Sequence, residues 1–177
     1  MRLDKAQRIE LAVSTDDGRE FIASAYLDTE RRELAATNGH VLVVLPVTLD
    51  DGDTTGRVSV EALKAARKLA TRGAPVEVQA NGALQLTNGA SYPRPDTCGE
   101  FPNYREVMPD YSARKTVTFG VNASYLWQVA QAIGCTKGDA NVMITIPVPS
   151  DDGDMLDPIK VERTGDDSVG VVMPCRL

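Results

Sequence analysis

The sequence predicts an α+β protein in which antiparallel sheets are covered on one side by two amphipathic helices. The first observation is that most apolar segments are short and end at turn residues such as Asn38-Gly39 and Asn81-Gly82. The second is that only two segments repeat apolar residues with the period of a helix. The third is that a strand, a helix and three strands follow one another twice, so each helix has one sheet face to cover.

Composition narrows the class of protein. The 177 residues suffice for one large domain or two small ones, and a hydrophobic content of 42% suits a globular core. No apolar run approaches the roughly 20 residues of a membrane span, and no apolar signal region follows Met1–Lys5, so we expect a cytoplasmic protein. Cys98, Cys135 and Cys175 lack metal-ligand spacing and are expected to be free thiols. The net charge of −6 excludes a general attraction to nucleic acid, so DNA contact needs a local basic surface.

Residues 1–50 are expected to form strands. Asn38-Gly39 lies between apolar residues and predicts a hairpin, because both residues favour positive φ. Pro46 ends the strand that follows, and Asp50–Asp53 is expected to be a solvated loop. The expected strands are the alternating residues Ile9, Leu11 and Val13, then Phe21–Leu27, Leu34–Ala36 and His40–Leu45.

The first helix is expected over Val58–Arg72, with Ser59 as its N-cap and Gly73 as its C-cap. Helical spacing places Ala62, Leu63, Ala66, Leu69 and Ala70 on the core face and Lys64, Arg67, Lys68 and Arg72 on the opposite face. These cations fit an ordinary solvated face. They also fit a surface that contacts DNA, because no carboxylate accompanies them in a chain whose acids outnumber its bases.

The second helix is expected to follow the N-cap Asn122 and to run to about Ile133, before Gly134. Leu126, Val129, Ala130 and Ile133 form its core face, and its polar face carries no charge. Further strands are expected at 76–80, 83–87, near Tyr92, and at 115–119, 141–148, 158–163 and 169–173.

The last seven residues, Val171–Leu177, hold a strand that Pro174 ends, because proline has no N–H to donate. Val169, Val171 and Met173 alternate onto one face of this strand. One interpretation is an ordinary terminal strand. The other is the wall of a groove for another protein's peptide, since Met173 and its neighbours are small or adaptable.

Four segments resemble signature segments of the bacterial sliding clamp, the beta subunit of the replicative DNA polymerase III. They are Ala36–Leu42, Phe101–Pro109, Asn122–Leu126 and Val171–Leu177, in the family's order. The resemblance implies a DNA-clamp-like fold: 1–110 is similar to the clamp's middle domain and 111–177 to half of its C-terminal domain, with one continuous domain as the alternative. Because the clamp's first domain has no counterpart here, the resemblance does not imply a closed ring.

The resemblance also implies a peptide-binding groove. Its residues would be Ile22, Thr37, Gly39, His40, Leu42, Pro102, Val107, Tyr125, Val171, Val172, Met173, Pro174, Cys175 and Arg176. Clamp helices carry the cations that face DNA, which assigns Lys64, Arg67, Lys68 and Arg72 to DNA binding. Three residues depart from the family. Val41 replaces the basic residue that usually follows the histidine, and Glu106 stands at a position that is often basic. Cys175 stands where the family has a second methionine.

The function implied is a sliding-clamp-like processivity or tethering factor of DNA replication. It would bind linear peptides of a polymerase or clamp loader, contact duplex DNA without sequence specificity and form a homo-oligomer. The alternative is a clamp-fold adaptor or decoy that binds peptides and does not encircle DNA. An enzyme is not expected, because His40 is the only histidine and no nucleophile accompanies it. No cofactor or metal is expected either, since Asp50–Asp53 and Asp151–Asp154 do not fit a calcium loop.

Overall fold

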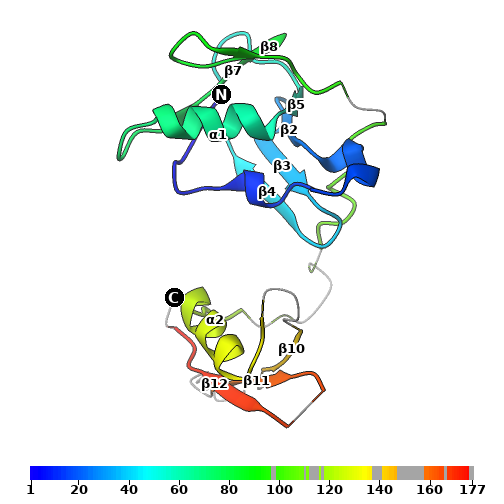
Figure 1. Cartoon of the computed structure of the whole chain (residues 1–177), viewed down its shortest axis with the longest axis vertical. Coiled ribbons are helices and arrows are strands. Elements are labelled where there is room, and N and C mark those ends of the chain that lie inside the picture. Colours follow the sequence, from blue (N-terminus) through cyan, green and yellow to red (C-terminus); the bar gives the residue numbers. More distant parts are fainter. Residues whose placement is uncertain are drawn as a thin grey trace. The chain divides into compact units, whose positions relative to one another are not determined.

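The structure is a computed structural model of the 177-residue chain. It describes residues 1–96, 99–109, 111, 116, 118–136, 141–146, 158–165 and 167–175. The chain forms two compact units, Met1–Pro109 (unit 1) and Asp110–Leu177 (unit 2), and each is described by itself (Figure 1). Cys98, Arg176 and the expected loop Asp151–Asp154 lie outside the described residues, as do parts of the strands expected at 115–119 and 141–148.

Unit 1 is built on a four-stranded antiparallel sheet. Its strands are β2 (Ala25–Asp28), β3 (Glu33–Thr37), β4 (Leu42–Pro46) and β5 (Gly56–Val58), in the order β4-β3-β2-β5. Leu34 pairs with Leu27 on one side and with Leu45 on the other. Leu27 and Leu34 are fully buried, so one face of the sheet forms the core.

Helix α1 (Val60–Leu69) packs its apolar side into this core (Figure 1). The side chain of Ser59 accepts a hydrogen bond from the N–H of Ala62 at 3.1 Å, as expected of an N-cap. The helix ends at Leu69 and not at the predicted Arg72. Ala70 has an extended ψ of 127°, and its carbonyl accepts a hydrogen bond from the ammonium group of Lys5, which stabilises the early end.

Two smaller sheets complete unit 1. β1 (Arg2–Leu3) pairs with β6 (Val76–Glu77), and β7 (Gln79–Asn81), β8 (Ala83–Gln85) and β9 (Ser91–Tyr92) form an antiparallel meander. The single strand expected at 76–80 is therefore divided between two sheets. The division falls at Val78, whose N–H donates to the Met1 carbonyl at 3.0 Å.

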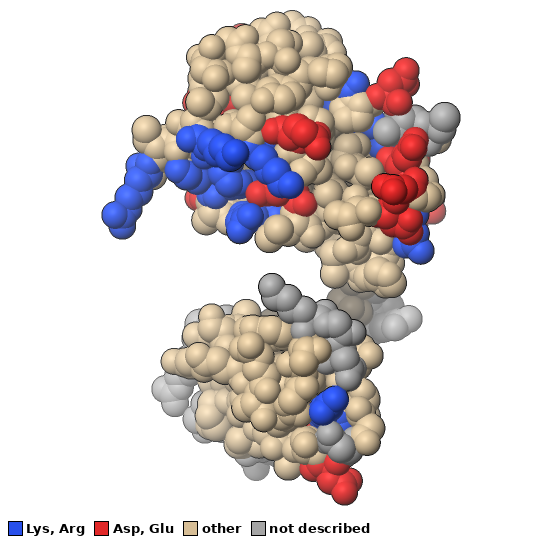
Figure 2. All heavy atoms as spheres, viewed as in Figure 1, with Lys and Arg blue, Asp and Glu red and all other residues tan. Residues whose placement is uncertain are grey.

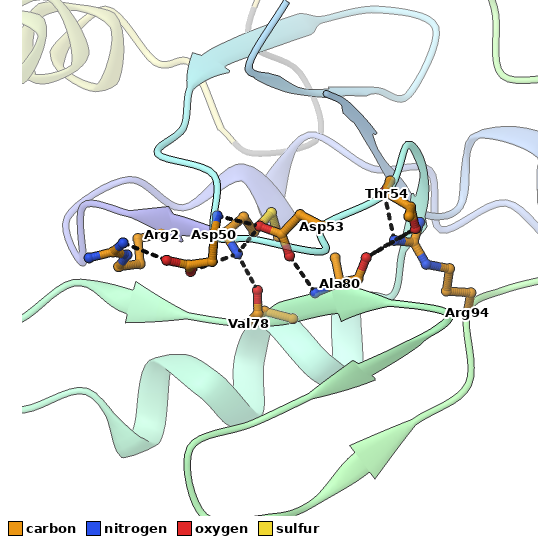
Figure 3. Close-up of polar contacts among 8 residues, drawn as sticks. Arg2, Asp50, Asp53, Thr54, Val78, Ala80 and Arg94 are labelled. Atoms are coloured by element: carbon orange, nitrogen blue, oxygen red, sulfur yellow. Dashed lines mark hydrogen bonds and ion pairs between the residues drawn. The ribbon is translucent and has the colours of Figure 1, made fainter. Parts of the chain in front are cut away.

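The loop Asp50–Asp53 is only partly the solvated loop that its composition predicts. The carboxylate of Asp53 is fully buried, lies 2.5 Å from the amino group of Met1 and accepts the N–H of Ala80 at 2.7 Å (Figure 3). Arg94 extends the network by donating to the carbonyls of Thr54 (2.7 Å) and Ala80 (2.6 Å). Burial acts to raise the pKa of Asp53, but the hydrogen bonds from Met1, Ala80 and Asp50 and the charge of the Met1 amino group outweigh it and hold the pKa below its ordinary value. The side chain of Asp53 can be buried because its charge is paired, whereas Asp51 and Gly52 in the same loop are exposed.

After β1, the segment up to Ile22 holds two 3₁₀ turns in place of the expected strands. These turns are η1 (Ile9–Leu11) and η2 (Asp17–Ile22). Asp16 caps η2 by accepting the N–H of Gly18 at 2.9 Å, and β2 begins only at Ala25. The apparent alternation around Ile9 arises from a turn that buries Ile9 and leaves Leu11 66% exposed.

Unit 2 is a three-stranded antiparallel sheet with one helix. Its strands are β10 (Val142–Thr145), β11 (Ile159–Arg163) and β12 (Val169–Val172), in that spatial order, and α2 (Ala123–Ala132) covers one face (Figure 1). The side chain of Asn122 caps α2 by accepting the Ser124 N–H at 2.9 Å. The predicted second helix is confirmed to within one or two residues.

Close packing joins α2 to this sheet at Gly170. A Cβ added to Gly170 would lie 2.5 Å from Val129 Cγ1, so only glycine admits the helix at this distance. Beyond β12, the N–H of Cys175 donates to the carbonyl of Gly120 at 2.8 Å and ties the segment before α2 to the segment after β12. The predicted α+β class, with antiparallel sheets and two amphipathic helices, is confirmed.

Candidate functional site

An apolar groove of about 460 Å³ lies on unit 1. It is lined by Arg19, Phe21, Ile22, Thr37, Gly39, His40, Val41, Leu42, Pro102, Asn103, Tyr104 and Val107. These residues come from three segments: η2, the turn between β3 and β4, and the stretch 102–107. The structure thus brings together the seven groove residues of unit 1 that the sequence analysis names: Ile22, Thr37, Gly39, His40, Leu42, Pro102 and Val107.

The turn between β3 and β4 forms one wall of the groove, and hydrogen bonds from its own side chains fix its conformation. Asn38 Oδ1 accepts the N–H groups of His40 (2.9 Å) and Val41 (3.0 Å). Thr37 Oγ1 accepts the N–H of Gly39 at 3.1 Å and donates to the Val41 carbonyl at 2.7 Å. Gly39 has a φ of +88°, a conformation that glycine adopts without strain. The side chains of His40 and Val41 are left exposed to a ligand.

The second wall is the stretch 101–107, which the sheet of unit 1 holds in place. The ring of Phe101 stacks on Tyr26 with centroids 5.1 Å apart, and Arg57 lies over the same ring. Tyr104 is buried, and its hydroxyl donates to Glu33 at 2.9 Å, with Asp28 at 3.2 Å. The wall is therefore fixed at two points, by the ring of Phe101 and by the hydroxyl of Tyr104.

The electrostatics of this anchor keep Tyr104 protonated. Its burial and its hydrogen bond to Glu33 raise the pKa of Tyr104 to about 12. Each carboxylate also has an arginine: Arg31 lies 2.9 Å from Asp28, and Arg105 pairs with Glu33. At neutral pH the phenol therefore remains a hydrogen-bond donor to paired carboxylates, and the wall is stable.

Five lining residues were not named in the sequence analysis as groove residues: Arg19, Phe21, Val41, Asn103 and Tyr104. Arg19 crosses the β3–β4 turn, where Nη1 donates to the Asn38 carbonyl at 3.3 Å and lies 2.7 Å from the position of a Cβ on Gly39. Their positions could have indicated them, because each of these residues lies within three positions of a predicted groove residue. The interpretation of η2 as a strand obscured it.

The predicted groove residues of unit 2 lie on β12, its extension and α2. Val171 and Met173 are 59% and 56% exposed, Tyr125 on α2 is 57% exposed, and Cys175 is also exposed. Val172 is an exception: it is buried, since strand alternation turns it toward Ile159 in the core of the unit. Val172 therefore does not present its side chain to a ligand. Pro174 is half-buried.

The predicted basic face of α1 is only partly available. Lys64 and Lys68 are exposed one turn apart, and Figure 2 shows blue side chains gathered over α1. Arg72 is exposed in the turn after the helix, where it lines a shared hollow with Lys5.

Arg67 is directed into the protein. Its Nε and Nη2 bind both oxygens of Glu10 at 3.0 and 2.9 Å, and Nη2 donates to the Gln7 carbonyl at 2.6 Å. Burial acts to raise the pKa of Glu10, but the hydrogen bonds and the charge of Arg67 outweigh it and lower this pKa below its ordinary value. Arg67 is thus a structural residue that joins α1 to the segment 5–10, and its predicted DNA-facing role does not fit these contacts.

The outer face of α2 carries no charged residue. It exposes Ser124, Gln128 and Gln131 together with Tyr125 and with Trp127, which is 40% exposed. Among the described residues no group of His, Cys, Asp and Glu has the arrangement of a metal site. In the same part of the chain, neither α-helix is long and apolar enough to cross a membrane.

Comparison with solved structures places this fold among bacterial sliding clamps. The DNA polymerase sliding clamp of Pseudomonas aeruginosa aligns with 100% of this chain, with a TM-score of 0.60 and 17% identity. The C. crescentus beta sliding clamp aligns with 100% of it (TM-score 0.58, 18% identity), and the Bartonella birtlesii clamp, solved with griselimycin, with 96% (TM-score 0.56, 17% identity). The alignments cover 66%, 66% and 62% of those three chains.

These similarities define the class: the protein has the fold of the bacterial sliding clamp, the beta subunit of DNA polymerase III, over about two thirds of the length of those clamps. The predicted resemblance is confirmed at the level of fold. No family model matches the chain, and no curated protein matches it.

Proposed function

We propose that this protein is a sliding-clamp-like tethering factor of DNA replication that captures short linear peptides of polymerase-type or loader-type proteins. The observation that carries the proposal is the groove of unit 1, where seven residues implied by the clamp resemblance line one cavity. Ile22 and Leu42 supply apolar surface, and His40 supplies hydrogen-bonding capacity for a peptide backbone. A groove of this kind typically gives micromolar affinity, about −8 kcal/mol.

The proposal assigns duplex DNA to the basic face of α1. Lys64, Lys68 and Arg72 present exposed cations, as contacts to the phosphate backbone require. Such contacts carry no sequence information and weaken with salt. The proposal also includes assembly of several copies in the cytoplasm, which the solution mass measured with and without DNA tests.

Peptide binding is tested with Val107→Asp in the full chain. Val107 is 69% exposed in the groove wall, so a charge there should leave the fold intact. We expect a Leu/Phe-containing peptide to lose about 2 kcal/mol or more in titration calorimetry, because a carboxylate enters an apolar site. Leu11→Asp is the matched control, since Leu11 is 66% exposed on η1 and does not line the groove. Equal affinities of the two variants would remove the groove assignment.

DNA contact is tested with the double variant Lys64→Glu and Lys68→Glu. We expect retention on DNA to fall and the dependence of log K on log salt to flatten by about 2, one for each lost phosphate contact. Arg32→Glu is the control, because it reverses the charge of one exposed residue in the turn between β2 and β3, as each lysine substitution does on α1. Unchanged DNA retention in the double variant would remove α1 as the DNA surface.

The second candidate is a peptide-binding adaptor that does not encircle DNA. Two observations favour it: α2 carries no cation, and Arg67 is occupied by Glu10. It predicts that the Lys64→Glu and Lys68→Glu variant keeps its peptide affinity and its function in the cell. Loss of cellular function with intact peptide binding would exclude the adaptor.

A further inference from the structure

We propose that the peptide held in the groove of unit 1 carries basic residues on both sides of its apolar anchors. This inference rests on the proposed peptide-binding function and concerns the chemistry of the partner. The observation behind it is that the rim of the groove, formed by η2 and the residues around 101–107, is negatively charged. The face of α1 in the same unit is positively charged.

The first part of the rim is η2. Asp16, Asp17 and Glu20 are all exposed there, next to Arg19 and Phe21, which line the groove. Figure 2 shows red side chains gathered on the side of unit 1 where η2 lies, at the right of the view. These three carboxylates do not line the apolar cavity themselves but neighbour residues that do, so we place them beside the flanks of a bound peptide.

The second part of the rim is the wall formed by the stretch 101–107, together with Glu100 just before it. Glu100 and Glu106 are exposed on either side of the stretch that contributes Pro102 and Asn103. Glu106 is held at the groove because its Oε1 accepts a hydrogen bond from Asn103 Nδ2 at 2.8 Å. Both η2 and the stretch around 101–107 therefore carry exposed carboxylates next to residues that line the groove.

The cations near the groove do not cancel this charge. Arg19 Nε lies 3.4 Å from Asp16, and Arg105 is paired with Glu33. Arg57 donates to the carbonyls of Phe21 (2.6 Å) and Gly99 (2.9 Å) behind the wall. Six carboxylates surround these three guanidinium groups: those of Asp16, Asp17, Glu20, Glu33, Glu100 and Glu106. Among the lining residues, the titratable side chains are Arg19, His40 and Tyr104.

Charges at such a rim act on peptide approach and on affinity over about one Debye length, ~8 Å at physiological salt. Exposed pairs contribute up to about fivefold each in affinity, and lysine or arginine flanks would form more than one. Glutamate flanks would meet like charges. The groove thus selects by its apolar interior and by its acidic edge together.

The test measures three synthetic peptides with the same Leu- and Phe-containing core, flanked on both sides by lysines, by serines or by glutamates. Each is titrated calorimetrically into the full chain. We expect the lysine-flanked peptide to bind about tenfold more tightly than the glutamate-flanked one at low salt. The difference should disappear near 1 M salt, where the Debye length is ~3 Å.

The rim is tested with the triple variant Asp17→Asn, Glu20→Gln and Glu106→Gln, which removes charge with little change in shape. It should abolish the preference and keep the affinity of the serine-flanked peptide. The control triple Glu30→Gln, Asp51→Asn and Glu61→Gln removes the same charge from exposed positions outside η2 and the stretch 100–107, and should keep the preference.

The outcomes separate the two proposals. Equal affinities, a preference for glutamate flanks, or a preference that survives in the rim variant would overturn this inference and leave peptide binding in place. Binding of none of the three peptides would overturn both.

Discussion

At the scale of single residues, Arg67 shows what helical spacing can predict about a side chain and what it cannot. Helical spacing correctly places Arg67 on the polar side of α1, with Lys64 and Lys68. Spacing along one helix does not reveal a partner far away in sequence, and Glu10 precedes Arg67 by 57 positions. The long arginine side chain reaches that buried carboxylate and two backbone carbonyls, whereas the lysines remain in solvent.

Arg67→Ala should therefore destabilise the protein much more than Lys64→Ala. Removing the guanidinium leaves the carboxylate of Glu10, 1% exposed, without its main partner, which costs about 3–5 kcal/mol. Lys64 is exposed, so its loss should stay within about 0.5 kcal/mol. Urea denaturation followed by circular dichroism measures both variants. Equal midpoints would contradict the structural role given to Arg67.

At the scale of elements, local signals with a backbone cause were reliable. Asn38-Gly39 correctly predicts the β3–β4 hairpin, but only Gly39 has a positive φ, and β4 begins at Leu42 and not at the predicted His40. Ser59 and Asn122 predict helix starts because their side chains accept hydrogen bonds from free N–H groups. Segments without such a cause were not predictable. Apolar alternation around Ile9 suits a strand as well as a 3₁₀ turn, and only the contacts of Glu10 with α1 decide between them.

The same limits apply to the groove. Its named residues came from the resemblance to clamps, and the structure brings those of unit 1 together at one cavity. The pinning of its second wall by Tyr104 and Glu33 was not predictable, because it joins residues 71 positions apart. Strand alternation alone would have removed Val172 from the set, since it lies on the opposite face from Val171.

The joint of α2 with β12 gives a prediction for unit 2. Gly170→Ala places a methyl group 2.5 Å from Val129 Cγ1, so the helix must move away from the sheet. We expect a loss of about 1–3 kcal/mol from overpacking. Val169→Ala is the control, since Val169 is 56% exposed one position earlier on the same strand. A thermal midpoint for Gly170→Ala at or above that of the control would show that the joint yields without strain.

At the scale of the whole molecule, the described carboxylates with lowered pKa belong to unit 1: Glu10, Asp28, Asp50 and Asp53. Burial opposes the shift in each, and hydrogen bonds with nearby positive charge produce it. A pKa that is lower in the folded state than in the unfolded state stabilises the fold above the unfolded value, about 4.

Unit 1 should therefore lose stability as the pH falls below about 4, where these groups take up protons on unfolding. Urea unfolding measured from neutral to acidic pH tests this expectation. Arg67→Ala should reduce the acid dependence, because the hydrogen bond and the charge of Arg67 are among the main causes that lower the pKa of Glu10. A free energy of unfolding that does not change across this range would contradict the paired-carboxylate description.

Trp127 makes the two units separable in such experiments. It is the only tryptophan of the chain and lies on α2 in unit 2, whereas the aromatic residues of unit 1 are tyrosines and phenylalanines. Its emission therefore reports the surroundings of α2, while far-ultraviolet ellipticity reports both units. In an acid titration, ellipticity that falls before the emission shifts would assign the first loss to unit 1. Trp127 thus serves as an intrinsic fluorescent probe of unit 2.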